Sequence, residues 1–167
     1  VGILSTAQKK EMLRPEDAAI ALESMTRLNK LGQLFGTLDY VKAMTDVTGF
    51  GLLGHLSEMC QGSGLVAHVN FEKVPIIAAA AYYLEQGCIP GGTGRNWASY
   101  GHQVGLLTER QRHLLADPQT SGGLLVAVAP HARDTFEAVL LSEGLELKPI
   151  GHLQTRTSDK EALITVH

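Results

Sequence analysis

The carboxylate of Asp46 stands in the stretch of the chain that is best suited to chemistry, residues 43–55, with the sequence AMTDVTGFGLLGH. A strand expected over residues 42–47 ends beside this aspartate, and Thr48, Gly49 and Gly51 follow within five residues. Glycines let the backbone of such a loop approach a ligand closely. Carboxylate oxygens are ligands for Mg²⁺, and the free N–H groups at the start of the next helix suit a phosphate. This corner is therefore a candidate site for a phosphate and the metal that accompanies it.

The same residues also fit a purely structural role. Thr45 or Asp46 can act as the N-cap of the next helix, and the glycines can simply make a tight connection. Motif spacing by itself leaves both interpretations open.

A helix is expected directly after this loop. Phe50, Leu53, Leu56 and Cys60 recur at three- and four-residue steps, a spacing that predicts one buried stripe. A second glycine loop, residues 117–123 with the sequence DPQTSGG, precedes the apolar run 124–128. We expect that run to be a strand that is covered on both faces or is central in its sheet.

The rest of the chain predicts the scaffold of an α+β domain. Strands are expected over residues 1–6, 65–71, 145–153 and 162–166, and helices over 15–31, 76–86, 109–115 and 130–144. In the helix over 15–31, which Gly32 ends, the spacing predicts a buried face of Ala18, Leu22, Met25, Leu28 and Leu31. A polar turn is expected over residues 155–160, and His68 is expected to be a surface or hydrogen-bonded residue of its strand.

Residues 88–106 show no helical or strand periodicity and contain a proline and three glycines in a row of eight residues, 89–96. We expect an irregular loop here. Long loops in compact domains are commonly functional, so Thr93, Arg95 and Asn96 are candidates to contact an anion or a neighbouring domain. A flexible surface connection is the alternative.

Length and composition limit the class of protein. The chain has 167 residues, of which 44% are hydrophobic, and a formal net charge of −3, as expected for one globular domain. It has no basic patch that would indicate nucleic acid, and no apolar run long enough to span a bilayer. Its two cysteines, Cys60 and Cys88, form no CxxC motif, which argues against a zinc site and fits a reducing cytoplasm.

The first residue is valine, and residues 1–6 resemble a strand that is already under way. We therefore expect residues 1–167 to be a single domain, the C-terminal piece of a longer protein.

Three segments taken together, residues 43–55, 91–96 and 117–125, resemble selenophosphate synthetase, a family also called selenide, water dikinase. The Thr-Asp-x-Thr-Gly and Asp-Pro-x-Thr-Ser-Gly-Gly elements are shared more widely, with the aminoimidazole ribonucleotide synthetase superfamily that includes thiamine-phosphate kinases. The segment 90–100 and Phe50 favour the selenium enzyme. The resemblance covers nearly the whole chain and matches the C-terminal half of that family. It implies a layered α/β domain with a mixed, largely antiparallel sheet covered by helices.

The resemblance also implies a reaction, in which ATP, selenide and water give selenophosphate, AMP and phosphate with Mg²⁺ as cofactor. Asp46 matches the metal-binding aspartate of this half of the family. The residues that are implied to line the nucleotide cleft are Thr45, Thr48, Gly49, Gly122 and Gly123.

No catalytic residue is expected in this chain. In the family the nucleophile, a cysteine or selenocysteine with a neighbouring lysine, lies in an N-terminal half, through which the subunits also pair as homodimers. Neither Cys60 nor Cys88 matches that nucleophile, so we expect the chain alone to be inactive.

Two rival interpretations remain open at this point. The chain can belong to another ATP-using member of the superfamily that acts on a carboxamide or a phosphate ester. It can also be a non-catalytic domain kept for dimerisation or for binding a partner.

Overall fold

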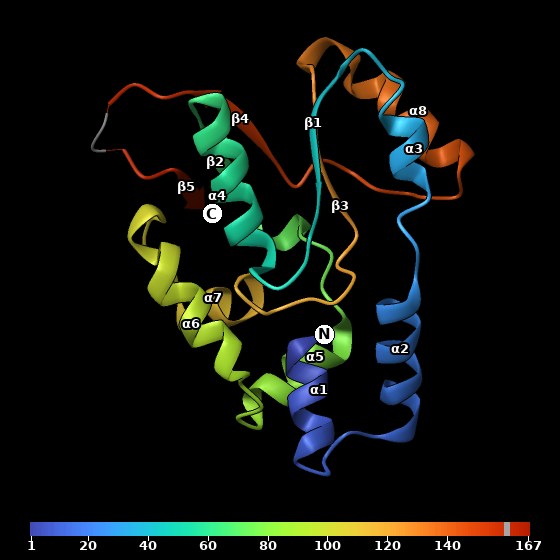
Figure 1. The fold of residues 1–167 in the computed structure, drawn as a ribbon, viewed down its shortest axis with the longest axis vertical. Helices are drawn as coiled ribbons and strands as arrows, with labels where there is room; N and C mark the ends of the chain where they lie inside the picture. The colour runs from blue at the N-terminus through green and yellow to red at the C-terminus, as the bar shows by residue number, and fades with distance from the viewer. Residues whose placement is uncertain (159–160) are drawn as a thin grey trace.

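The structure is a computed structural model that describes residues 1–158 and 161–167, and it has an α+β fold (Figure 1). Its described residues form two small sheets. In the first, β1 (Val41–Asp46) pairs antiparallel with β3 (Leu124–Val128). In the second, β2 (Leu65–Val69) lies between β4 (Gly151–Thr155), which is antiparallel to it, and β5 (Ile164–Val166), which is parallel. The expected fold class, with largely antiparallel pairing, is confirmed, but the strands form two sheets and not one.

The helices pack around these sheets. They are α1 (Gly2–Lys9), α2 (Pro15–Thr26), α3 (Leu31–Phe35), α4 (Gly51–Ser63), α5 (Ala78–Glu85), α6 (Gly91–Tyr100), α7 (Glu109–Leu115) and α8 (Arg133–Ser142), with the short 3-10 turns η1 (Phe71–Lys73), η2 (Gly101–Gln103) and η3 (Pro130–Ala132).

Helix α4 is the centre of the largest apolar core. Leu53, Leu56 and Cys60 are buried against β2 and β5, as their spacing predicts. Phe50 departs from the predicted stripe, because it precedes the helix and is 52% exposed. The helix ends at Gly64, whose φ of 69° is in the left-handed region that favours glycine. The predicted strand 42–47 and helix after it are therefore confirmed.

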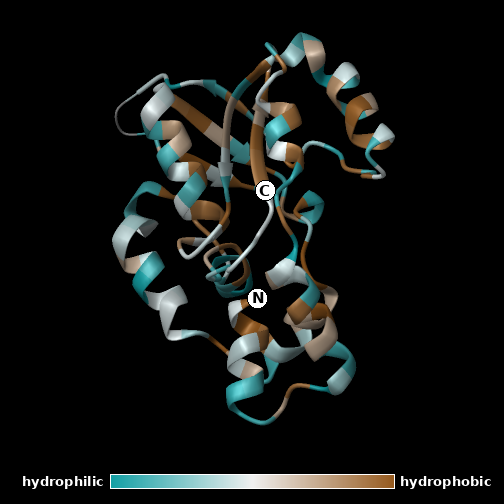
Figure 2. Ribbon diagram, turned by 45° about the vertical axis from the view of Figure 1, so that its right-hand side comes forward, coloured by the Kyte–Doolittle hydropathy of each residue, from teal (hydrophilic) through white to brown (hydrophobic). Residues whose placement is uncertain are grey.

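Two smaller cores complete the packing. One joins α1, α2 and α5 and contains Ile3, Leu4 and Tyr83; the other joins α3 and α8 through the edge-to-face pair Phe35 and Phe136. Figure 2 shows hydrophobic residues both in the central strands and in the helices near the N-terminus.

The predicted strand over residues 1–6 is wrong, because this segment is helix α1. A short apolar run does not distinguish a strand from a buried helix. Here Ile3, Leu4 and Ala7 share the helical face that packs on α5.

The helix predicted over residues 15–31 is too long, and only part of its predicted face is buried. Helix α2 ends at Thr26, because Arg27 has an extended backbone. Leu22 is 60% and Leu28 71% exposed, whereas Asp17 and Ala21 are buried. The buried carboxylate of Asp17 accepts a 2.6 Å hydrogen bond from the hydroxyl of Tyr83, so the buried side of the helix is shifted toward Asp17 and Ala21, while Met25 still packs on the core that joins α1, α2 and α5.

The irregular loop predicted over residues 88–106 is also wrong, since most of it is helix α6. Its buried residues, Thr93, Asn96 and Tyr100, do lie at helical spacing. Two of the three are polar, so a search for apolar periodicity misses the helix.

Further differences concern the extent and burial of strands. β3 is only half-buried along its length and, in the part of the chain that the structure describes, pairs with β1 alone, so it is not a central strand. β4 begins at Gly151 and not at residue 145. Within the expected turn 155–160, residues 159 and 160 lie outside the described residues.

Candidate functional site

The two glycine loops meet at one end of the β1–β3 ribbon, because the loop that leaves β1 and the loop that enters β3 lie at the same end of an antiparallel pair. Backbone hydrogen bonds join them: Val47 donates to the carbonyl of Gly123 at 2.9 Å, and Gly122 donates back to Val47 at 2.8 Å. The N–H of Gln119 donates to the carbonyl of Thr48 at 3.1 Å. The structure thus brings the predicted residues of both loops into one corner.

Asp46 is the last residue of β1, opposite Leu124, and it is exposed. Among the described residues its carboxylate has no hydrogen-bond or ion-pair partner, so both oxygens are accessible to a ligand. Mg²⁺ is bound through one or two carboxylates together with waters and substrate phosphates, and a single exposed carboxylate fits such a role.

One carboxylate does not make a complete metal site. In the described ranges no group of three or more His, Cys, Asp or Glu residues is placed to hold a metal ion. Any metal at Asp46 therefore takes its other ligands from water, from phosphate oxygens or from another polypeptide segment.

The three other predicted residues of the first loop differ in their surroundings. Thr45 is partly buried, and its hydroxyl donates to the carbonyl of Asp46 at 3.1 Å. The backbone N–H of Thr48 donates to Nε2 of His55 at 3.0 Å. Gly49 is exposed, and an added Cβ there would have open space around it. Of these three, Gly49 offers the most accessible backbone.

Gly122 and Gly123 both have a conformational reason to be glycine. A Cβ on Gly122 would lie 2.7 Å from the carbonyl oxygen of Val47, and Gly123 has a φ of 85°. Either feature excludes most side chains from the close pairing of the two loops. The glycines of the second loop are therefore explained by geometry whether or not a nucleotide lies beside them.

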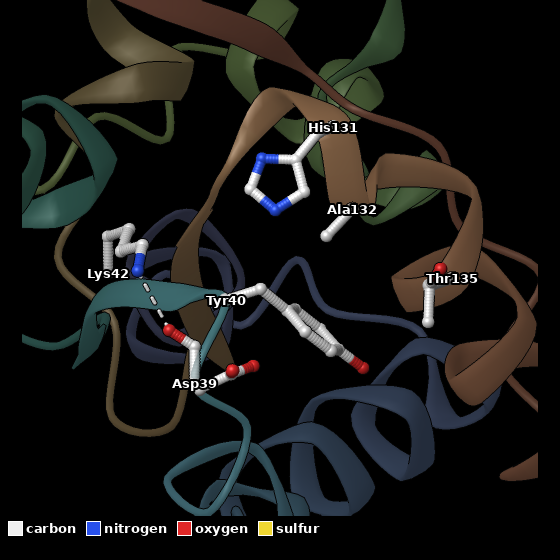
Figure 3. Close-up of a pocket in the computed structure, with 6 residues that line it drawn as sticks. All are labelled: Asp39, Tyr40, Lys42, His131, Ala132 and Thr135. Carbon is white, nitrogen blue, oxygen red and sulfur yellow. Dashed lines mark hydrogen bonds between the residues drawn. The ribbon is translucent and has the colours of Figure 1, made fainter.

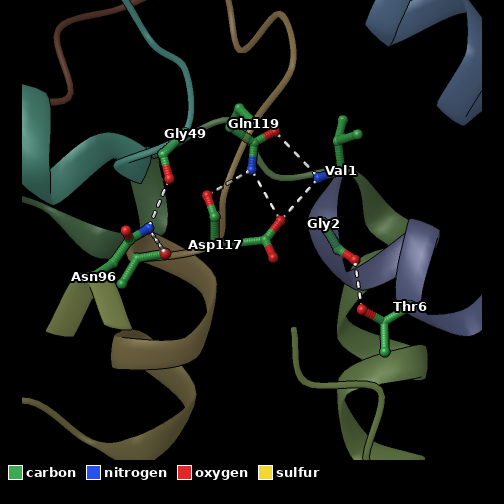
Figure 4. Close-up of polar contacts among 8 residues, drawn as sticks. Val1, Gly2, Thr6, Gly49, Asn96, Asp117 and Gln119 are labelled. Atoms are coloured by element: carbon green, nitrogen blue, oxygen red, sulfur yellow. Dashed lines mark hydrogen bonds and ion pairs between the residues drawn. The ribbon is translucent and has the colours of Figure 1, made fainter. Parts of the chain in front are cut away.

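Asn96 joins the first loop to the end of α7, directly before the second loop, a role that the sequence does not reveal. Its buried side-chain amide donates to the carbonyl of Gly49 at 2.8 Å and to the carbonyl of Ala116 at 3.0 Å (Figure 4). Thr93 is buried on the same helix, and Arg95 is exposed. The side chains of Thr93 and Asn96 are thus part of the packing of α6, and Arg95 alone of the three faces solvent.

Tyr100 adds a second contact between α6 and the first loop. Its hydroxyl donates to the carbonyl of Phe50 at 2.7 Å, and burial raises the pKa of this tyrosine. The protonated hydroxyl is therefore a stable donor at neutral pH.

The second aspartate of these loops, Asp117, is buried and faces α1. Its Oδ2 accepts a hydrogen bond of 2.9 Å from the side-chain amide of Gln119. Burial raises the pKa of Asp117, and the hydrogen bond from Gln119 opposes the shift. Since Asp117 is 3% exposed and Asp46 is exposed, Asp46 is the accessible carboxylate of the two.

Neither cysteine has the surroundings of a nucleophile. Both are buried, and burial raises the pKa of Cys60 to about 11, which keeps it in the thiol form. The Sγ of Cys88 lies 3.9 Å from the sulfur of Met12.

A separate depression of about 410 Å³ lies at the opposite end of β1 (Figure 3). Its lining residues are Asp39, Tyr40, Lys42, His131, Ala132 and Thr135. It contains none of the predicted site residues, and the ammonium of Lys42 donates to the backbone carbonyl of Asp39 at 2.8 Å.

In the described part of the chain, each helix is too short or too polar to cross a bilayer.

Comparison with known proteins supports the interpretation of the three motifs. A family model described as AIR synthase related protein, C-terminal domain, matches residues 2–163. The chain is 58% identical over 158 residues to the Selenide, water dikinase of Pseudomonas putida, covering 95% of this chain and 46% of that protein. It is 55% identical over 160 residues to the protein of the same name from Photorhabdus laumondii, covering 96% and 46%. The resemblance drawn from the motifs is thus confirmed, and the chain spans about half the length of the curated relatives it matches.

Solved structures confirm the fold. Thiamine-monophosphate kinase from Stenotrophomonas maltophilia K279a aligns with a TM-score of 0.62 and 20% identity, over 97% of this chain and 48% of that chain. The corresponding kinase from Aquifex aeolicus aligns with a TM-score of 0.53 and 14% identity, over 99% and 46%. At these identities the likeness concerns the fold and not the reaction.

Proposed function

Because this chain belongs to the family of C-terminal domains of AIR synthase related proteins, we propose that it is the C-terminal domain of a selenide, water dikinase. The proposed reaction of the complete enzyme converts ATP, selenide and water into selenophosphate, AMP and phosphate. The name of the curated relatives supports this reaction, and the observation that carries it to this chain is the position of Asp46. Its carboxylate is exposed and unpaired among the described residues, where the two hydrogen-bonded glycine loops meet.

In this proposal Asp46 supplies one carboxylate oxygen to a Mg²⁺ ion. When bound, that ion neutralises the phosphate charge of ATP during phosphoryl transfer. The rest of the corner suits a phosphate for independent reasons. Helix α4 begins at Gly51, so the positive end of its dipole lies five residues after the aspartate, although the N–H of Gly51 itself donates to the carbonyl of Thr48. Gly49 leaves open space beside the loop.

The chain supplies only part of the proposed active site. Both of its cysteines are buried, and neither can serve as an accessible nucleophile. We assign the nucleophile, the remaining metal ligands and the dimer contacts to an N-terminal domain of the same protein. We place the complete enzyme in the cytoplasm. The isolated 167-residue chain should then show no ATP-to-AMP turnover with selenide, and robust turnover by this chain alone would contradict the division of roles.

The central test is Asp46→Asn in the full-length enzyme. Asparagine keeps the size of the side chain and removes the charge, so folding should be unchanged because Asp46 is exposed and unpaired among the described residues. Loss of one oxyanion-hole donor, which also stabilises charge in a transition state, lowers kcat by about 10²–10³-fold, and we expect Asp46→Asn to lower kcat to a similar extent. The assay is Mg²⁺-dependent conversion of ATP to AMP in the presence of selenide.

Asp134→Asn is the matched control. Asp134 is also an exposed aspartate, but it lies in the first turn of α8, a helix that packs in a different core. Its substitution should leave turnover unchanged. If Asp46→Asn is folded and retains full turnover, Asp46 is not a metal ligand. The interpretation of this chain as a non-catalytic domain is then favoured.

A further inference from the structure

His55 reaches from the second turn of α4 back to the loop that carries Asp46. The residue is 7% exposed, and its Nε2 lies 3.0 Å from the backbone nitrogen of Thr48 and 3.2 Å from the Oγ1 of the same threonine. One imidazole nitrogen therefore contacts both polar groups that Thr48 presents on this side.

The direction of the first hydrogen bond determines the form of the ring. A backbone N–H can only donate, so Nε2 of His55 must be an acceptor. The ring then carries its hydrogen on Nδ1, which lies 3.4 Å from the carboxylate of Glu58, an exposed residue one turn further along α4. The ring edge of Phe50 also packs at 6.0 Å between centroids, which limits rotation of the imidazole.

Thr48 is the point through which the two glycine loops are coupled. Its carbonyl accepts hydrogen bonds from Gly51 at 2.9 Å and from Gln119 at 3.1 Å. Its neighbour Val47 makes two further backbone hydrogen bonds to the second loop, one with Gly122 and one with Gly123. A contact that fixes the N–H and hydroxyl of Thr48 therefore also fixes the backbone two residues after Asp46.

We propose that His55 is the positioning residue of the Asp46 loop, since its unprotonated Nε2 anchors Thr48 and so holds the carboxylate at the point where the two loops meet. This inference rests on the function proposed above for its effect on catalysis. The anchoring of Thr48 does not rest on that function, because it can be measured without metal or nucleotide. In this proposal the hydroxyl of Thr48 has His55 as its partner and not a ligand.

The test compares His55→Leu with His55→Gln in the full-length protein. Leucine fills the space without an acceptor, whereas the glutamine side chain has an oxygen at about the position of Nε2. His131→Leu is the control, because His131 is exposed on η3, away from both loops. The first readout is amide hydrogen exchange of residues 44–53, measured without ligands. His55→Leu should exchange about tenfold faster there, as expected for the loss of one hydrogen bond, and His55→Gln and His131→Leu should match the unsubstituted protein.

The second readout is the Mg²⁺ concentration that gives half-maximal ATP turnover. Groups that orient a metal ligand typically contribute about 10–100-fold to metal affinity. His55→Leu should raise this concentration by about tenfold, with a smaller change in kcat at saturating Mg²⁺, and His55→Gln should restore it. If His55→Leu does not fold, His55→Asn replaces it, because its shorter amide does not reach Thr48.

The outcomes separate the two proposals. Unchanged exchange over residues 44–53 in folded His55→Leu or His55→Asn overturns the positioning role. If Asp46→Asn abolishes turnover, but His55→Leu exchanges faster without any change in Mg²⁺ dependence, the effect of His55 on catalysis is overturned. Faster exchange together with full activity of Asp46→Asn supports the anchoring of Thr48 by His55 and refutes the function proposed for Asp46.

Discussion

Gly51, where the Asp46 loop passes into the first residue of α4, should be harder to replace than Gly49 or Gly64. It has a φ of 70°, and a Cβ added to it would lie 2.8 Å from the carbonyl carbon of Ala116 and 3.0 Å from the carbonyl oxygen of Asp117. The two obstacles are independent. The first is local to Gly51, and the second arises because the backbone of the second loop passes directly over it.

Two other glycines separate these contributions. Gly64, at the far end of the same helix, has nearly the same φ of 69°, but a Cβ there meets nothing within 4 Å. Gly64→Ala should therefore lower the free energy of unfolding by about 1–2 kcal/mol, the cost of placing alanine in the left-handed conformation. Gly51→Ala should cost that amount plus about 1–3 kcal/mol for overpacking against backbone, or about 2–5 kcal/mol in all. Gly49→Ala has open space and no positive φ, so its effect on stability should stay within about 1 kcal/mol.

Equilibrium urea unfolding of the three variants, followed by far-UV circular dichroism, measures these differences in the free energy of unfolding. The comparison uses transition midpoints at an unchanged m-value. For a chain of this length each kcal/mol corresponds to a shift in Tm of about 2–4 °C. If Gly51→Ala destabilises the protein no more than Gly64→Ala, the close approach of the two loops at this point is not rigid, and the reasoning fails.

Two further predictions concern polar contacts. Asn96→Ala removes the two side-chain hydrogen bonds to the carbonyls of Gly49 and Ala116 and should lower the free energy of unfolding by about 2–4 kcal/mol. Asn96→Asp should destabilise further because it sets a carboxylate against two carbonyl oxygens, and equal urea midpoints for the two variants would contradict this account. In α8, Glu137 accepts hydrogen bonds from Lys148 and Arg133, and these bonds lower the pKa of Glu137 below its usual range. Glu137 therefore stabilises the fold at neutral pH, and this stabilisation is lost as the pH falls through its folded-state pKa. Glu137→Gln should therefore unfold at lower urea than the parent at neutral pH but not in acid, and a difference that persists in acid would refute an electrostatic origin.

Several features of the fold are predictable from sequence because the residues that cause them are neighbours in the chain. The buried stripe of α4 is set by the spacing of Leu53, Leu56 and Cys60, and its end is set by Gly64. Helix α7 has a local capping box, in which Thr108 and Gln111 exchange hydrogen bonds. Such interactions need no knowledge of the rest of the molecule.

Other features depend on partners that are distant in sequence. The buried side of α2 includes Asp17, which accepts a hydrogen bond from Tyr83, 66 positions away, so apolar periodicity alone does not predict which side is buried. Helix α6 is missed for a related reason. Asn96 is buried because it finds two carbonyls in other segments, and a polar residue gives no sign of such burial in sequence.

The candidate site divides in the same way. The sequence by itself identifies Asp46 and the two glycine loops, because a carboxylate beside glycines at the end of a strand is a local pattern. Only the tertiary structure decides that the loops lie together, that Asp46 is accessible while Asp117 is buried, and that His55 anchors Thr48. The antiparallel pairing of β1 with β3 is the physical reason, since it brings chain segments that lie some 70 positions apart to the same end of one ribbon.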